Sequence, residues 1–140
     1  MPSVVVDTST LVGAAMKRQS IPRLAFERII ARHTLVASPA VLREVEEVLM
    51  RPKFDRFVPR DIRAGFILLI RHYALTHDPA EHIRACRDPK DDMYLSLAVS
   101  AGADCIVSSD DDLLCLSPFR GIPILTPRAF LDQDMVPGPA

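Results

Sequence analysis

The sequence predicts an α/β protein in which helices cover both faces of a parallel β-sheet. Short runs of apolar and β-branched residues, such as Val4–Val6 and Cys105–Val107, are typical of strands that are buried on both faces. Segments of helical length and helical spacing lie between these runs, and no internal repeat interrupts the order. Because strands that alternate with helices are joined by crossover connections, the neighbouring strands are expected to be parallel.

Capping residues and periodicity indicate the elements of the first half. Pro22 suits the first turn of a helix, and Ser38 followed by Pro39 suits an N-cap and a first helical residue. Apolar residues recur at helical spacing from Ile62 to Tyr73. The predicted elements are a strand at Val4–Val6, helices at Leu11–Lys17 and Pro22–Arg32, a strand at Thr34–Ala37, and helices at Pro39–Met50 and Pro59–Tyr73.

The second half repeats the alternation. Asp88 with Pro89 predicts a helix start, and Gly102 predicts its end. The predicted elements are a short strand at Ala74–His77, a helix at Asp88–Ala101, strands at Cys105–Val107 and Gly121–Leu125, and a helix at Pro127–Asp132. We expect one domain over residues 1–132 and a flexible C-terminal tail over residues 133–140.

Composition limits the class of protein. A chain of 140 residues with 49% hydrophobic residues fits one globular domain. No apolar stretch approaches the roughly 20 residues of a membrane span, and Met1 leads directly into a strand, so a cytoplasmic protein without membrane contact is expected. The three cysteines contain no C-x-x-C pair, so neither a disulfide framework nor a zinc site is predicted.

Charge is distributed unevenly although the net charge is only −1. Residues 1–72 hold 12 Lys and Arg against 7 Asp and Glu, whereas residues 73–140 hold 5 against 11. The basic residues between 51 and 71 are compatible with a phosphate-facing surface or with a solvated helix face, and taken alone they favour the solvated face. They are Arg51, Lys53, Arg56, Arg60, Arg63 and Arg71.

Asp7 and Asp110 each lie just beyond a predicted strand. The carboxyl ends of parallel strands meet at one edge of a sheet, where open α/β folds bind their ligands. A carboxylate at the end of a buried strand also needs a hydrogen bond, a cation or a shifted pKa. We therefore expect both acids at the same edge of the sheet.

The helical periodicity indicates which acids on the predicted helices face the core and which face water. At about 100° per residue, Asp91 shares a face with Leu95 and Ala98 and should point inward, whereas Asp92 should point towards water. In the helix predicted at Pro39–Met50, the phase does not separate Glu44 from Glu46, and only Glu47 is clearly outward.

Helix capping is the simpler explanation for several of these acids taken one at a time. Asp88 and Asp91 stand three apart at a helix start, and Asp110–Asp112 precede a short turn. Capping explains four gathered acids less well, because each pair of unit charges at about 4 Å costs roughly 1–4 kcal/mol. A bound divalent ion would relieve this repulsion.

Hard cations such as Mg²⁺ prefer oxygen ligands and commonly bind through carboxylates beside a phosphate. Such an ion lowers the pKa of a bound water and so prepares it to attack phosphorus. The acids therefore predict metal-assisted phosphodiester hydrolysis without a nucleophilic side chain. A haloacid-dehalogenase-like phosphatase needs a second Asp at the position of Ser9, a receiver domain needs an acidic pair before the end of the first strand, and neither is present.

Four segments carry a resemblance to a known family. They are VVVDTSTLV, ASPAVLREVEEVL, CRDPKDDMYLSLAVSAGADCIVSSDDDLL and IPILTPRAFL, and together they extend over nearly the whole chain to about Leu131. In order and spacing they resemble PIN-domain ribonucleases, particularly the VapC-like branch of toxin components of toxin–antitoxin systems. The resemblance implies a three-layer α/β/α sandwich with a central parallel sheet, similar to Rossmann-like folds, and endonucleolytic cleavage of RNA.

The resemblance also implies the site. Its four acids fall on Asp7, Glu44, Asp91 and Asp110, with the hydroxyls of Thr8 and Ser9 beside the first. We expect Asp7, Asp91 and Asp110 to hold Mg²⁺ or Mn²⁺, and Glu44 to act through a bound water or as a base. Asp88 and Asp112 are interpreted as capping or supporting groups.

Partners are implied in the same way. The family suggests an inhibitory antitoxin protein and a homodimer, for which candidate apolar surfaces include Phe54, Phe57, Phe66 and Tyr73, although core packing explains most of these residues. A non-catalytic nucleic-acid-binding module of the same fold, and a nuclease that acts in RNA processing or on single-stranded DNA, stay open as alternatives.

Overall fold

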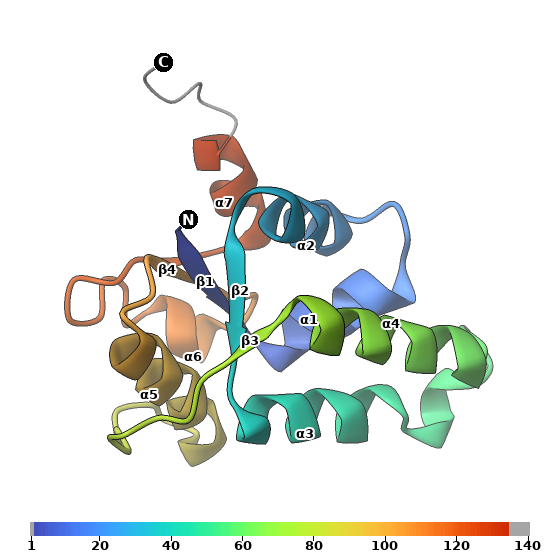
Figure 1. Cartoon of the computed structure of the whole chain (residues 1–140), viewed down its shortest axis with the longest axis horizontal. Helices are drawn as coiled ribbons and strands as arrows, with labels where there is room; N and C mark the ends of the chain where they lie inside the picture. The colour runs from blue at the N-terminus through green and yellow to red at the C-terminus, as the bar shows by residue number, and fades with distance from the viewer. Residues whose placement is uncertain (1, 135–140) are drawn as a thin grey trace.

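A five-stranded parallel sheet forms the centre of the protein, as a computed structural model shows for residues 2–134 (Figure 1). The strand order is β3-β2-β1-β4-β5, and every pair of neighbouring strands is parallel. The strands are β1 (Ser3–Val6), β2 (Thr34–Ala37), β3 (Leu75–Thr76), β4 (Cys105–Val107) and β5 (Ile124–Leu125).

Helices lie on both sides of this sheet, which gives the predicted three-layer α/β/α sandwich. Figure 1 shows α5 on one side, and α1, α2 and α4 on the other. The helices are α1 (Thr8–Met16), α2 (Ile21–Arg32), α3 (Pro39–Leu49), α4 (Arg60–Tyr73), α5 (Asp92–Ala101), α6 (Asp111–Leu114) and α7 (Pro127–Asp134), with 3₁₀ turns η1 (Pro52–Phe54) and η2 (Pro89–Asp91).

The central strand explains why the first apolar run of the sequence is continuous. β1 lies between β2 and β4, so that Val5 pairs with Val36 on one side and with Ile106 on the other. Helices cover both faces, and the side chains of Val4–Val6 are at most 2% exposed. The carboxyl ends of β1 and β4 therefore lie side by side and carry Asp7 and the segment that leads to Asp110.

Two predicted helices begin differently in the structure. The first starts at Thr8 rather than Leu11, because the Asp7 carboxylate caps it by accepting a hydrogen bond from the Thr10 N–H. The helix predicted at Asp88–Ala101 is divided into η2 and α5. Asp88 caps the 3₁₀ turn, so the predicted capping role is confirmed for this residue.

Two predicted strands are shorter in the structure. β3 keeps only Leu75–Thr76 of the predicted Ala74–His77. β5 keeps only Ile124–Leu125 of the predicted Gly121–Leu125, because Gly121 has φ +81° in a turn closed by antiparallel pairing of Phe119 with Ile122.

Arg63 contradicts both predictions made for the basic residues 51–71, because its side chain is buried and faces neither phosphate nor water. Nη1 donates to the carbonyl oxygen of Leu49 at 2.8 Å, and Nε donates to that of Val58 at 2.9 Å. Nη2 binds the carboxylate of Asp55. The last carbonyls of a helix have no partner within it, and Arg63 of α4 satisfies the one at Leu49, the last residue of α3.

The predicted tail falls mainly on residues 135–140, which lie outside the described part of the chain. Within residues 2–134, none of the helices combines the length and the apolar character that a membrane crossing requires.

Candidate metal centre

The four predicted acids line one cavity at the carboxyl ends of the strands. Its volume is about 360 Å³, and Asp7, Glu44, Asp91 and Asp110 all contribute to its wall. We call this cavity the acidic pocket. The acids come from the end of β1, from α3, from η2 and from the segment after β4, so that only the folded chain brings them together.

Asp7 is held in one orientation by hydrogen bonds. Asp7 is only 2% exposed, and its Oδ1 accepts a hydrogen bond from the Thr10 N–H at 2.9 Å. Oδ2 accepts from the hydroxyls of Ser9 and Ser108. The Ser108 hydroxyl oxygen also accepts from the Asp110 N–H at 2.9 Å, and therefore links two of the predicted acids.

Three carboxylates lie close together, and two of them, Asp91 and Asp110, belong to the wall of the acidic pocket. One oxygen each from Asp91, Asp110 and Asp112 lies within 4.8 Å of the other two. Asp7 lines the same cavity but is not part of this group of three. In residues 2–134, no lysine or arginine forms an ion pair with any of the three carboxylates.

This crowding changes the proton affinity of Asp91. Burial, and then the negative charge of Asp110, raise its pKa from the ordinary 3.8 to about 7. Three unpaired carboxylates within 4.8 Å are a donor set of oxygens alone, which fits a hard divalent cation and does not fit a soft thiophilic one.

Asp112 was expected to cap or support the site and lies within the cluster itself, whereas Ser108 was not singled out from the sequence. The sequence indicated a cap at Asp110, and the structure confirms it, because Asp110 Oδ1 accepts from the Asp112 N–H at 2.9 Å. This short turn also brings the Asp112 carboxylate to the cluster. Ser108 is fully buried directly after β4, and a serine at the end of a buried strand is the signal that identifies it.

Tyr94 supports the wall beside Asp7. Its hydroxyl donates to Thr8 Oγ1 and accepts from the Thr8 N–H at 3.1 Å. Burial raises the pKa of Tyr94 to about 12, so the phenol stays protonated and keeps this donor. Its position three residues after Asp91 places both residues on one face of the segment, which is the sequence signal for its role.

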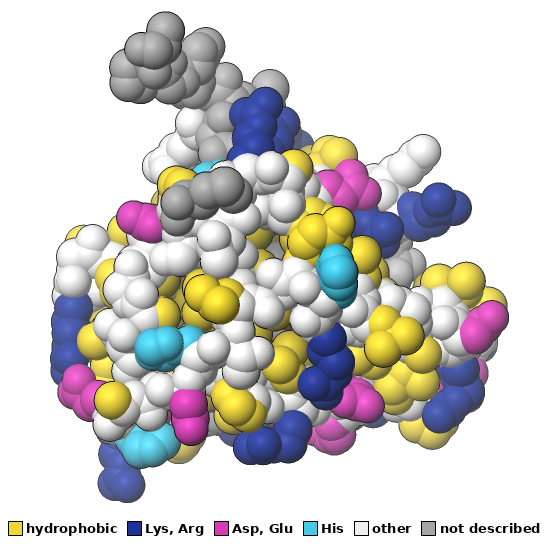
Figure 2. Space-filling model, viewed as in Figure 1, with side chains coloured by type: hydrophobic (Ala, Val, Ile, Leu, Met, Phe, Trp, Pro, Cys, Tyr) yellow, Lys and Arg dark blue, Asp and Glu magenta, His cyan; other side chains and the backbone are white. Residues whose placement is uncertain are grey.

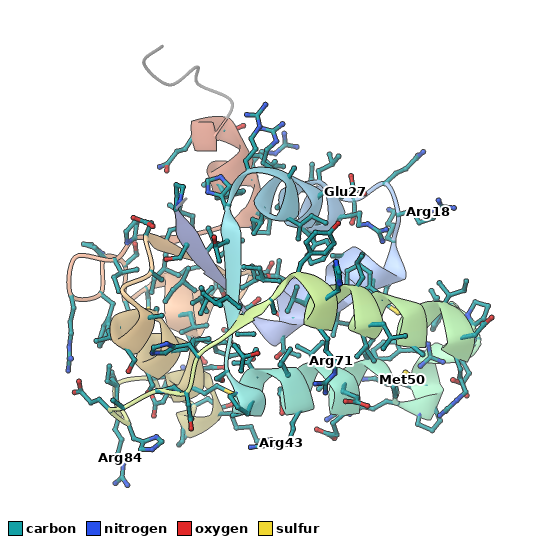
Figure 3. The ribbon with its side chains drawn as sticks, in the orientation of Figure 1. Arg18, Glu27, Arg43, Met50, Arg71 and Arg84 are labelled. Atoms are coloured by element: carbon teal, nitrogen blue, oxygen red, sulfur yellow. The ribbon has the colours of Figure 1, made fainter. Side chains whose placement is uncertain are left out.

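The structure separates the three glutamates of α3. Glu44 lines the acidic pocket, whereas Glu46 binds Arg71 at 2.7 Å and Glu47 binds Arg51 at 3.1 Å. Figure 3 shows Arg71 extending from α4 towards α3. The paired glutamates are therefore structural, and Glu44 alone of the three faces the site.

The prediction that Asp92 points towards water is wrong. Its Oδ1 accepts from the N–H groups of Ala85 and Cys86 at 3.0 and 2.7 Å. The first of these hydrogen bonds is the main cause of the lowered pKa of Asp92. Helical phase predicts only which face of α5 carries Asp92. The loop before η2 folds over that face, and its backbone N–H groups donate to the carboxylate.

Comparisons with known proteins agree with this architecture. The family model described as PIN domain matches residues 3–112. The uncharacterized protein MJ1680 of Methanocaldococcus jannaschii is 28% identical over 143 residues, with 93% of this chain and 90% of that protein covered.

Three solved structures share the fold at identities that support a likeness of fold alone. PAE2754 from Pyrobaculum aerophilum has a TM-score of 0.66 at 16% identity, and covers 95% of this chain and 90% of its own. VapBC2 from Rickettsia felis, bound to a DNA fragment from the promoter, has a TM-score of 0.61 at 11% identity, and the match covers 89% of this chain and 98% of that one. VapC20 from Mycobacterium tuberculosis, a sarcin-ricin loop cleaving toxin, has a TM-score of 0.56 at 14% identity, and the match covers 86% of this chain and 98% of that one. Since the family model spans most of the chain, this protein belongs to the PIN domain family.

Proposed function

We propose that this PIN domain is a metal-dependent endoribonuclease that hydrolyses phosphodiester bonds with water. The observation that carries the proposal is the convergence of Asp91, Asp110 and Asp112 without a cationic partner. Such a cluster is unfavourable unless a cation is bound or protons are taken up. The position of the cluster, at the carboxyl ends of parallel strands, is where α/β folds bind ligands.

Asp91 and Asp110 are proposed as ligands of Mg²⁺ or Mn²⁺, together with Asp7, and Asp112 is added to the predicted set. The ion would place positive charge against the phosphate and lower the pKa of the attacking water. Asp7 is suited to a fixed position because hydrogen bonds hold both of its oxygens.

The remaining residues of the acidic pocket have complementary roles in the proposal. Glu44 makes no ion pair within residues 2–134 and is the candidate base for a proton of the attacking water. Lys90 lines the same pocket and is the nearest candidate for binding the RNA backbone. Of the basic residues between 51 and 71, Arg51, Arg63 and Arg71 are paired with acids of their own and do not line this pocket.

The toxin assignment is a finer proposal. Two proteins that share the fold are VapBC2, which was solved on a DNA fragment from its promoter, and VapC20, which is a toxin that cleaves the sarcin-ricin loop. We propose an antitoxin partner and a homodimer for this chain on that basis. The exposed apolar residues Ile62, Leu68 and Tyr73 of α4 and Leu75 of β3 are candidates for such contacts, whereas Phe66 is buried and drops out.

Co-purification tests this finer proposal. Leu68→Glu should weaken self-association or antitoxin capture, because it places a charge on the exposed face of α4. Light scattering after gel filtration measures the mass of the particle. A monomer that captures no small protein encoded beside its gene would contradict the toxin assignment and leave the nuclease proposal intact.

The nuclease proposal is tested by cleavage of a labelled single-stranded RNA with Mn²⁺ or Mg²⁺. Asp91→Asn and Asp110→Asn should each lower the rate by about a hundredfold or more, since even partners of metal ligands contribute about 10–100-fold. Asp111→Asn is the matched control, because Asp111 is exposed and next in sequence to Asp110.

The other outcomes of this assay separate the alternatives. Full activity of Asp91→Asn would refute the site. Equal cleavage of single-stranded DNA would show that the 2′-hydroxyl is not required. Tight RNA binding without cleavage, and without stabilisation by Mn²⁺ in thermal unfolding, would favour the non-catalytic binding module.

A further inference from the structure

A second and larger cavity lies beside the acidic pocket. Its volume is about 950 Å³, which lies within the roughly 300–1,000 Å³ of typical ligand sites. Its walls come from the first turns of α3 and α5 and from the loop over residues 78–86. We call it the large cavity, and the proposed hydrolysis does not require it.

The two cavities share a wall. Met93 lines both, and on α3 Arg43 lines the large cavity while its neighbour Glu44 lines the acidic pocket. Successive residues on a helix point about 100° apart, so α3 presents different residues to the two cavities. Because the cavities share a wall, one nucleic acid strand can contact both.

The large cavity carries cations at its rim. Arg43 and Arg84 are exposed, and neither forms an ion pair in the part of the chain that the structure describes. Figure 3 shows both side chains extending along the lower edge of the molecule, from α3 and from the loop before η2. Figure 2 shows dark blue Lys and Arg side chains at this lower edge, together with cyan His and magenta Asp and Glu. Unpaired cations beside an acidic metal pocket suit the phosphates that flank the cleaved bond.

The interior of the large cavity suits a nucleotide base. Ile83 and Met93 supply apolar surface, while Asp78 and His82 supply polar atoms at the rim. Sequence-selective proteins commonly stack an unpaired RNA base on aromatic side chains or arginine guanidinium planes and hydrogen-bond its edge, and His82 and Arg84 are such groups in this lining.

Hydrogen bonds to α5 hold the outer wall of the large cavity in place. The Ile83 N–H donates to Ser96 Oγ at 2.9 Å, and the N–H groups of Ala85 and Cys86 donate to Asp92. Three anchors on one helix preform the wall, so binding a base does not require the loop to be ordered first.

We propose that the large cavity holds the base of the nucleotide next to the cleaved phosphate, with Arg43 on a neighbouring phosphate. This inference rests on the proposed nuclease function and deepens it by assigning the residues that select the cleavage site. The substrate is then an unpaired stretch of RNA, since a paired base cannot leave its stack without additional cost.

Binding is tested without catalysis by titrating AMP, GMP, CMP and UMP into ¹⁵N-labelled full-length protein in EDTA. At least one nucleotide at millimolar concentration should shift the amide signals of Ile83, Ala85 and Cys86. Arg43→Glu should weaken this binding about tenfold, which corresponds to about 1.4 kcal/mol. Arg18→Glu is the matched control, because Arg18 is exposed and lies on the opposite side of the molecule in Figure 3.

Cleavage of a randomised RNA with Mn²⁺ tests selection. Ala40→Trp adds a large side chain to the wall of the cavity at an exposed position and should change the nucleotide preference beside the cut. An unchanged preference in Ala40→Trp would overturn the inference, as would lining amides that none of the four nucleotides moves. Nucleotide binding without any cleavage would support the base cavity while contradicting the nuclease, so the two proposals fail separately.

Discussion

Charged side chains gather in two regions of this molecule, and the regions differ in whether the charges are paired. In the basic segment, residues 51–71, Arg51, Arg63 and Arg71 each bind a carboxylate. In the acidic pocket, Asp91 and Asp110 crowd together without an ion pair to lysine or arginine in residues 2–134. Charge density along a sequence therefore indicates a surface, whereas unpaired charge gathered by the fold indicates a ligand.

Arg63→Ala tests the structural half of this comparison and has the largest expected effect. Removing the guanidinium takes a donor away from three carbonyl oxygens and from Asp55, and should lower the free energy of unfolding by about 3–5 kcal/mol. Urea denaturation measures this change. Arg60→Ala should cost at most about 1 kcal/mol, because that exposed side chain lies 4.0 Å from Asp55, and comparable losses in both variants would contradict the comparison.

Asp91→Asn tests the charge in the acidic pocket through pH. The pKa of Asp91 is raised from 3.8 to about 7, so keeping it ionised destabilises the metal-free fold. Its contribution is most favourable below pH 4 and is lost as the pH rises towards 7. In EDTA, Asp91→Asn should therefore unfold at a higher temperature than the wild type at pH 8, and this gain should shrink towards pH 5.

Added Mn²⁺ completes the same experiment. The ion should stabilise the wild type at pH 8, by about 2.7 kcal/mol at a hundredfold excess over its Kd, and should stabilise Asp91→Asn much less. A gain for Asp91→Asn that does not depend on pH would show that Asp91 is not under electrostatic stress.

Ser108→Ala tests how the two regions satisfy buried charge. The acidic pocket holds Asp7 through neutral donors rather than an arginine, and Ser108 also bonds the Asp110 N–H. Its loss should cost about 1–3 kcal/mol in urea denaturation and about 10–100-fold in cleavage rate. Ser109→Ala should change both measurements less, because Ser109 is exposed and its hydroxyl contacts only that of Thr10 among the described residues.

Glu46→Gln has the smallest expected effect and sharpens the comparison within one helix. It breaks the ion pair with Arg71, which is about half exposed, and should cost about 0.5 kcal/mol or less with no loss of cleavage. Glu44→Gln, two residues away, should lower the cleavage rate strongly. If Glu46→Gln lost as much activity as Glu44→Gln, pairing would not distinguish structural acids from functional ones.

Local sequence signals were sufficient to predict the main strands of the sheet and to predict that the acids lie close together. The buried runs Val4–Val6, Thr34–Ala37 and Cys105–Val107 became strands, since each fits a parallel sheet covered on both faces. The strand ends then predicted that Asp7 and Asp110 lie at one edge, and helical phase predicted that Asp91 lies with them, although it misplaced Asp92.

Errors arose where a second segment supplied the partner. Asp92 faces a loop that returns from an earlier part of the chain, and Arg63 reaches the end of the preceding helix. Neither contact follows from periodicity, because both depend on how elements pack. Asp112, interpreted from the sequence as a capping or supporting group, has its carboxylate in the cluster, because a turn too short to show a periodic pattern brings it there.

Asp7 both starts α1 and shapes the acidic pocket, because its Oδ1 accepts from the Thr10 N–H. Asp91 offers no such cap to α5. A homologue that had lost its chemistry would still benefit from a capping residue at position 7, and asparagine would serve there nearly as well. In relatives that have lost catalysis, the aspartate at position 91 should therefore be replaced before the one at position 7. The residue at position 91 is then the better indicator of which relatives are still active.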